Sequence, residues 1–98
     1  MKLDDFQTSL TENAPPTQLS LPLQALWQDA KGNWDAAHKL VQSDEGEAKA
    51  DWVHAYLHRK EGDLSNAGYW YRRAGKVTSQ QTLAEEWQAI VQALLVAA

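Results

Sequence analysis

The sequence predicts an all-α protein, and three observations lead to this prediction. Its 98 residues include 15 alanines, the strongest helix formers, but only six valines and isoleucines, which favour strands. Apolar residues recur at spacings of three and four, and isolated glycines separate the periodic stretches. Five tryptophans among these alanines suit closely packed helices, because an indole can fill the space that alanine leaves open. The length allows one domain.

Composition and charge exclude several classes of protein. The chain has no cysteine, so disulfides, thiolate metal sites and cysteine nucleophiles are excluded. No apolar run approaches the ~18 residues of a spanning helix and no secretory signal is visible, so we expect a cytoplasmic protein without a membrane partner. The net charge is −4. Residues 52–98 carry five bases and four acids, a local balance that allows a small anionic ligand but argues against nucleic acid as a partner.

Residues 1–18 are expected to form a loosely ordered N-terminal arm. Leu3, Phe6 and Leu10 have helical spacing, but the prolines at 15 and 16 separate this stretch from the rest of the chain. Residues 19–98 are expected to form a single helical-repeat-like domain.

The first two helices of this domain are marked by their ends. Ser20 can cap the first helix, which has Pro22 in its first turn and ends at Gly32. Asn33 can cap the second, which ends before the polar break at 44–46. The buried stripes are expected to be Leu23, Leu26, Trp27 and Ala30 in the first helix, and Trp34, Ala37, Leu40 and Val41 in the second.

The remaining helices obey the same rules. A third helix is expected over about 47–61, and Asp63 can cap a fourth that ends at Gly75. Thr78 and Gln81 resemble a capping box for a last helix of about 18 residues. The third helix has apolar residues on two flanks, so we expect it to be covered on two sides.

The second and fourth helices begin with the same pattern. Residues 31–37 read KGNWDAA and residues 61–67 read EGDLSNA. Each copy has a glycine, a small polar cap, a large apolar residue and then an alanine. This repetition predicts one helical hairpin used twice.

The second copy, with Gly62, Asp63, Leu64, Ala67, Tyr71 and Ala74, resembles the second half of a tetratricopeptide repeat. The first copy departs from that pattern at Asp44. The resemblance implies four to five helices, arranged as two stacked antiparallel hairpins closed by a C-terminal capping helix. The family is chiefly a protein-interaction scaffold. Residues 54–75 are also similar to a segment of small uncharacterised bacterial proteins, which implies no activity.

One face of the third helix carries candidate ligand residues. Asp51, His54, His58 and Glu61 fall at i, i+3, i+7 and i+10. Two histidines at i and i+4 can reach one metal ion, and the carboxylates could complete or orient the site. The alternative is a polar face turned to solvent, or histidines hydrogen-bonded within a hairpin.

Aromatic and basic residues on the fourth helix form a candidate partner-binding surface. Tyr69 lies beside Arg72 and Arg73 at i+3 and i+4, where a guanidinium can stack on its ring. Trp70 and the nearby Arg59 extend the surface with residue types common in interface hot spots. The alternative is that the last helix covers these rings and Arg73 merely lies over Tyr69.

The sequence predicts no catalytic residue and no cofactor, because it lacks both a nucleophile motif and a glycine-rich phosphate loop. We therefore expect a small non-enzymatic adaptor that binds a protein or peptide. The alternative is a small enzyme or a metal- or anion-binding protein that uses His54, His58 and Glu61. A homodimer through the C-terminal helix is expected, since no charge follows Glu86. The arm folding over that helix is the alternative.

Overall fold

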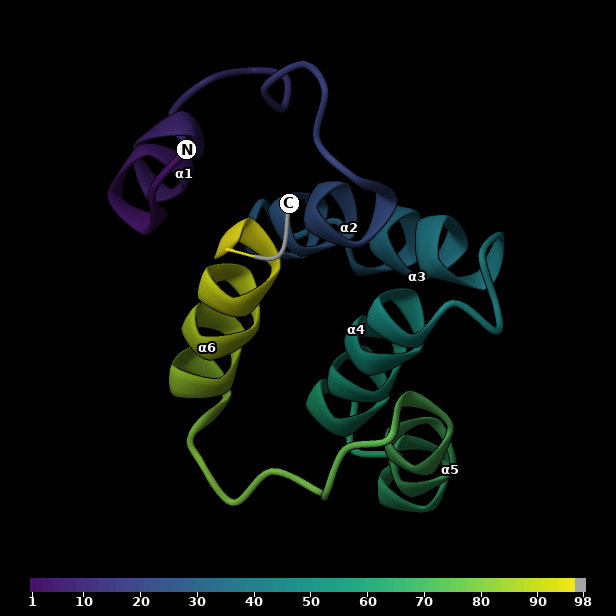
Figure 1. Ribbon diagram of the computed structural model, residues 1–98. Helices are drawn as coiled ribbons and strands as arrows, with labels where there is room; N and C mark the ends of the chain where they lie inside the picture. Colours follow the sequence, from purple (N-terminus) through teal and green to yellow (C-terminus); the bar gives the residue numbers. More distant parts are fainter. Residues whose placement is uncertain (97–98) are drawn as a thin grey trace.

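The computed structural model describes residues 1–96, and every regular element within them is an α-helix (Figure 1). This confirms the all-α prediction, although the six helices exceed the four to five expected. The helices are α1 (Leu3–Ser9), α2 (Leu21–Ala30), α3 (Trp34–Gln42), α4 (Ala48–Lys60), α5 (Leu64–Ala74) and α6 (Leu83–Val96).

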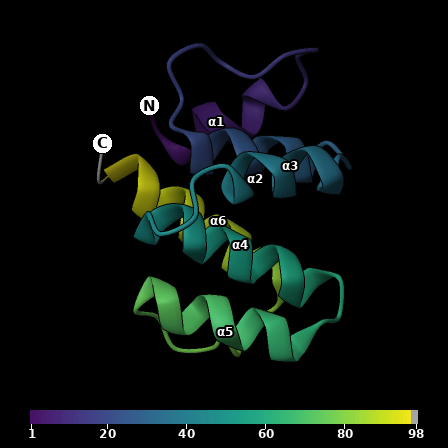
Figure 2. The same ribbon diagram turned by 90° about the vertical axis from the view of Figure 1, so that its right-hand side faces the viewer.

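Helix α4 lies at the centre of the molecule. It packs most extensively against α5, and it also contacts α2, α3 and α6. Figure 2 shows α5 on one side of α4 and the α2–α3 pair on the other. This position explains the two apolar flanks of α4, because Val53, Ala55 and Leu57 are all fully buried. The expected coverage on two sides is confirmed.

The turns that join α2 to α3 and α4 to α5 have the same backbone geometry. Gly32 and Gly62 have φ values of 85° and 90°, a left-handed conformation that glycine adopts without steric penalty. In the first turn the amide of Asn33 donates to the carbonyl of Gln28. In the second, the equivalent bond runs from Asp63 to His58, so the two turns share their hydrogen bonding as well as their backbone conformation.

The helix caps agree with the sequence in part. The Asp63 carboxylate accepts a hydrogen bond from the amide of Asn66, as expected. Ser20 and Asn33 precede α2 and α3 at the predicted positions, but neither side chain caps its helix. Asn33 instead donates to the side chain of Gln28.

Helix α6 begins later than the sequence suggests. The reciprocal bonds of its capping box join Thr82 and Glu85, so the expected box at Thr78 and Gln81 was wrong. The carbonyl of Gln81 accepts from Arg59 in α4, and residues before Thr82 belong to the loop that crosses from α5 to α6 (Figure 1).

Where the sequence predicts a loose arm, the structure contains α1, packed against α6. Phe6 is fully buried, and its ring centroid lies 5.8 Å from that of Trp87. The Trp27 indole donates to the hydroxyl of Ser9, which fastens the end of α1 to α2. Burial of the phenyl ring accounts for this docking. The arrangement matches the alternative in which the arm folds over the last helix.

The apolar end of α6 is exposed in part. Leu94 is buried, whereas Val96 is 80% exposed. Ala97 and Ala98, which belong to the apolar run expected to form a dimer contact, lie outside the described residues. Among the helices of residues 1–96, none combines the length and the apolar character that crossing a membrane requires.

Candidate functional site

The three histidines of the chain meet in one cluster where α3 packs against α4. His38 comes from α3, and His54 and His58 come from α4. The three ring centroids are 4.8–5.1 Å apart in pairs. The Nε2 atoms of His38 and His54 are 3.1 Å apart, so one donates a hydrogen bond to the other. We call these three residues the histidine cluster.

Local structure and helix packing both place these rings. His54 and His58 are one turn apart on α4, as their spacing predicts. His38 lies one turn after Trp34 on α3, and the two rings stack at 5.0 Å with an interplanar angle of 7°. The Trp34 indole donates to the carbonyl of Leu57 on α4. This bond ties the start of α3 to α4 and brings His38 to the cluster.

A second indole closes the opposite side. Trp70 on α5 stacks on His54, with 3.8 Å between ring centroids and an interplanar angle of 15°. Only 8% of Trp70 is exposed, and His54 itself is almost completely buried. The histidine cluster therefore lies between Trp34 and Trp70, with apolar walls that restrict the movement of its rings.

The environment keeps the imidazoles of His38 and His54 uncharged. Burial lowers the pKa of His54 to about 3, and the neighbouring His38 and His58 add to this effect. Burial and the proximity of His58 also lower the pKa of His38. Neutral imidazole is the form that binds a metal ion. At neutral pH these two rings are therefore in the protonation state that a metal ion requires.

Charged residues of both signs lie near the cluster. The carboxylates of Glu61, Asp35 and Glu45 act to raise the pKa of His38, against the effect of burial. On the other side, the positive charge of Arg73 adds to the lowering of the pKa of His54. The acids therefore favour a cation on the His38 side of the cluster.

His58 has a partner at each ring nitrogen. Its Nδ1 lies 2.6 Å from Oε1 of Glu61, and this carboxylate oxygen accepts a hydrogen bond from the ring N–H. Its Nε2 lies 3.4 Å from the side-chain nitrogen of Asn66. With the proton on Nδ1, Nε2 carries a lone pair that can accept from Asn66 or bind a metal ion.

The distances in the cluster fit a metal site. One nitrogen from each histidine lies within 4.8 Å of the others. In a tetrahedral zinc site with bonds of ~2.0–2.1 Å, ligand nitrogens are roughly 3.3 Å apart. The 3.1 Å between His38 and His54 is already close to that value. A second group of ligand atoms within the same limit consists of His58, Glu61 and Asp63.

Asp51, the fourth member of the predicted face, is not part of the cluster. It is buried, and one carboxylate oxygen accepts a hydrogen bond from the amide of Gly46. The other oxygen lies 3.8 Å from Nε of Arg73. Asp51 therefore joins the loop before α4 to α5. His54, His58 and Glu61 are the residues of that face that the structure brings together.

The predicted partner-binding residues lie in different environments. Tyr69 is 45% exposed, and its hydroxyl accepts from Arg73, whose guanidinium also lies 5.0 Å from the Trp70 ring. Arg72 is exposed. Arg59 forms an ion pair with the buried Glu86 on α6 at 2.8 Å. Trp70 and Arg59 therefore have partners within the protein, whereas Tyr69 and Arg72 face outward.

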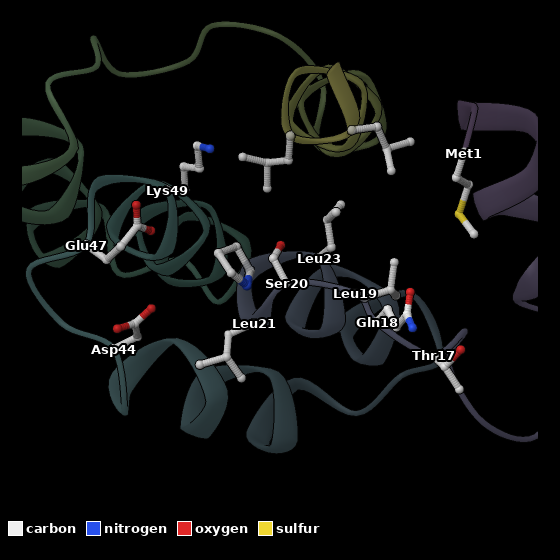
Figure 3. A pocket seen from close by; sticks show the side chains of 13 residues that line it. Met1, Thr17, Gln18, Leu19, Ser20, Leu21, Leu23, Asp44, Glu47 and Lys49 are labelled. Carbon is white, nitrogen blue, oxygen red and sulfur yellow. The ribbon is translucent and has the colours of Figure 1, made fainter. Parts of the chain in front are cut away.

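A separate cavity of about 720 Å³ lies near the end of α6 (Figure 3). Leu19, Leu21 and Leu23 line its middle, and Figure 3 shows Asp44, Glu47 and Lys49 together at one end. None of the three histidines lines it. Its walls are mainly aliphatic, and it does not combine convergent ionisable groups with an enclosed shape.

Sequence reasoning missed His38, because a residue on another helix gives no local signal. The spacing of Trp34 and His38 offered one indirect clue, since it places an indole and an imidazole on the same face of α3. Asn66 likewise has no local signal in the sequence. Its contact with His58 depends on how α4 and α5 pack.

No protein-family model, curated protein or solved structure matches the chain.

Proposed function

We propose that this protein binds a transition-metal ion through His38, His54 and His58. One observation carries the proposal: all three histidines of the chain converge, although His38 lies on a different helix from the other two. Structural needs alone give little reason to bury neutral imidazoles against one another, because each ring leaves polar atoms that require partners. One of them, Nδ1 of His54, is buried without a hydrogen bond.

The ligand atoms favour zinc, with copper and nickel as competitors. Imidazole nitrogens suit these borderline ions, whereas calcium and magnesium prefer sites made of oxygen ligands. Zinc binds three nitrogens and a further ligand in a tetrahedral arrangement without strain. On the His38 side of the cluster, the carboxylates of Glu61, Asp35 and Glu45 add to the attraction for a divalent cation.

Glu61 would support the site through His58. A metal-bound histidine has one remaining ring N–H. A carboxylate that accepts a hydrogen bond from this N–H fixes the tautomer and makes the metal-binding nitrogen a stronger ligand. The bond of 2.6 Å between Glu61 and Nδ1 of His58 has this geometry. In this proposal Glu61 is a positioning residue, and it does not touch the metal.

Titration of the untagged, metal-free protein with zinc tests the proposal. We expect one ion per chain, a submicromolar dissociation constant and a rise in melting temperature that a chelator reverses. His38→Ala should abolish this binding, since it removes one of three ligands. Because His38 is only half-buried, this variant is expected to fold. The control is Lys39→Ala, which removes an exposed neighbour on the same helix.

Two results would overturn the proposal. One is a protein that shows no saturable zinc, copper or nickel binding while it remains folded. The other is binding that His38→Ala and His58→Ala leave unchanged, because the ion would then occupy surface carboxylates instead of the histidine cluster.

Peptide binding at the outer face of α5 is the second candidate function. It is favoured by the exposed Tyr69, which is held by Arg73, and by the neighbouring Arg72. Tyrosine and arginine often dominate the binding energy of interfaces, and two guanidinium groups favour an acidic peptide. Tyr69→Ala together with Arg72→Ala should abolish capture of acidic peptides on an array and leave zinc binding unchanged.

This second function would rest on a tetratricopeptide-like scaffold. The resemblance implies two stacked hairpins, and the pairs α2–α3 and α4–α5 are candidates for them. Support for this relation comes from the matching backbone conformation at Gly32 and Gly62 and from the shared hydrogen bonds of the two turns. The metal-binding proposal does not depend on it.

A further inference from the structure

We propose that a metal ion held by the histidine cluster keeps one open coordination position, at which a small anion binds and accepts a hydrogen bond from Asn66. This inference rests on the proposed function and names the class of ligand that the site would take. It concerns the difference between a closed structural site, with four protein ligands, and a site with three protein ligands and an exchangeable fourth.

The histidine cluster offers three protein ligands to an ion. One nitrogen from each histidine lies within 4.8 Å of the other two. Within residues 1–96, no carboxylate oxygen lies this close to all three nitrogens. The two acids of the predicted α4 face and Asp63 already have partners. Glu61 accepts from His58, Asp51 accepts from Gly46, and Asp63 caps α5. A tetrahedral ion at the cluster would therefore have three protein ligands.

Asn66 lies beside the prospective metal site. Its side-chain nitrogen is 3.4 Å from Nε2 of His58, so this amide contacts a prospective metal ligand. A metal ion on Nε2 would use the lone pair that now faces the amide. The half-buried amide would then need another acceptor. An atom bound at the fourth position of the metal is the neighbouring group that could accept this bond.

Access to the cluster and the charge of a bound ion both favour a small anion. Trp34 and Trp70 cover the cluster from two sides, whereas Glu61 at its edge has a side chain that is 38% exposed. These indoles close two sides of the cluster to a bulky ligand. A divalent ion with three neutral ligands keeps its full charge of +2, so it favours an anion with a nitrogen or oxygen donor. Acetate and azide are suitable probes.

The test uses the full chain loaded with cobalt(II), a spectroscopically visible substitute for zinc. We expect azide and acetate to change the visible absorption of bound cobalt in a saturable manner. Asn66→Ala should weaken the affinity for each anion about tenfold, which is the effect of one hydrogen bond to a charged group. The affinity for cobalt itself should change much less. Ser65→Ala, an exposed neighbour in the same helical turn, is the control.

The outcomes separate this inference from the proposed function. A folded protein that binds neither cobalt nor zinc, copper or nickel would overturn the proposed function. Tight binding with a spectrum that neither anion alters would overturn the open position and leave metal binding intact. Anion binding of equal strength in Asn66→Ala and in the unmodified protein would overturn the role of Asn66.

Discussion

The α2–α3 and α4–α5 hairpins share their scaffold but differ in the residues that form the histidine cluster. Residues buried at equivalent positions include the pairs Ala25 and Ala55, Leu26 and Tyr56, Ala37 and Ala67, and Val41 and Tyr71. The histidines fall where the copies differ. His54 and His58 of α4 correspond to Gln24 and Gln28 of α2. The equivalent positions supply buried core residues, and the candidate site uses positions at which the two helix pairs differ.

The two hairpins also differ at the position of His38, but here the cluster residue belongs to the first hairpin. His38 on α3 corresponds to Gly68 on α5, which has no side chain. Trp34, one turn earlier, stacks on His38, whereas the equivalent Leu64 is 67% exposed. Each hairpin therefore contributes a different part of the cluster, and neither contains it alone. The site depends on the packing of α3 against α4.

Removal of α1, which packs against α6, should have the largest effect. Deletion of residues 1–14 removes Phe6, and the loss of one buried phenyl ring alone costs about 3–5 kcal/mol of stability. It also uncovers Trp87 on α6. We expect a second copy to cover that face, so the truncated protein should become a dimer through α6. Light scattering at micromolar concentration measures this change.

The intact chain is the control for this deletion. A dimer of the intact protein would show that α1 does not suffice to cover α6, and would support the homodimer expected from the sequence. A truncated protein that stays folded and monomeric would contradict a dimer through α6, both for the truncated and for the intact protein.

Acid should destabilise the protein because His54 takes up a proton more readily in the unfolded chain. This contribution should be absent when glutamine, the equivalent residue of α2, replaces His54. The pKa of His54 falls from about 6.5 in the unfolded chain to about 3 in the folded protein. The unfolded state therefore binds a proton first as the pH drops. The free energy of unfolding should decrease between pH 6.5 and 3 by up to about 4 kcal/mol from this group.

Urea unfolding of the metal-free protein at a series of pH values measures this dependence. The matched variant is His54→Gln, since glutamine occupies the equivalent position in α2. Its stability should fall less steeply below pH 6.5, because only the remaining titrating groups contribute. Parallel curves for the two proteins would show that His54 is not held uncharged by the fold.

The smallest effects are expected at the glycines of the two turns. Gly32→Ala and Gly62→Ala should each destabilise by about 1 kcal/mol, because alanine disfavours positive φ. An added Cβ meets no atom within 4 Å at either site, so strain of the backbone is the whole effect. Gly68→Ala is the matched control. Its Cβ would make an ordinary contact with Arg72, and alanine should stabilise α5 by about 0.5–1 kcal/mol.

Thermal unfolding of the three variants gives this comparison directly. Equal losses at Gly32 and Gly62 would support the equivalence of the two hairpins. A loss at one position only would show that the turns differ in energy despite their shared hydrogen bonds.

The sequence predicted the helices well because their signals are local. The glycine turns and the apolar stripes of α2 to α5 depend on residues a few positions apart, and the structure contains these helices near the expected bounds. The docking of α1 could not be predicted in this way. Phe6 is buried by Trp87, which lies far away in the chain.

The candidate site was predictable only on one helix. The spacing of His54, His58 and Glu61 was sufficient to place them on one face of α4. The third histidine and Asn66 join them through contacts between helices, which leave no trace in the spacing of residues. Asp51 shares that face in sequence, but its bond to Gly46 directs it elsewhere.

The stacking of Trp34 and Trp70 on the imidazoles has a consequence for the thermodynamics of binding. A flexible side chain that is immobilised by a ligand loses conformational entropy, at a cost of ~0.5–1.5 kcal/mol for each side chain. Here the folded protein already holds His38 and His54 between the indoles. An arriving ion would therefore meet a preorganised set of ligands, and the entropy of ordering them would have been lost during folding instead of during binding.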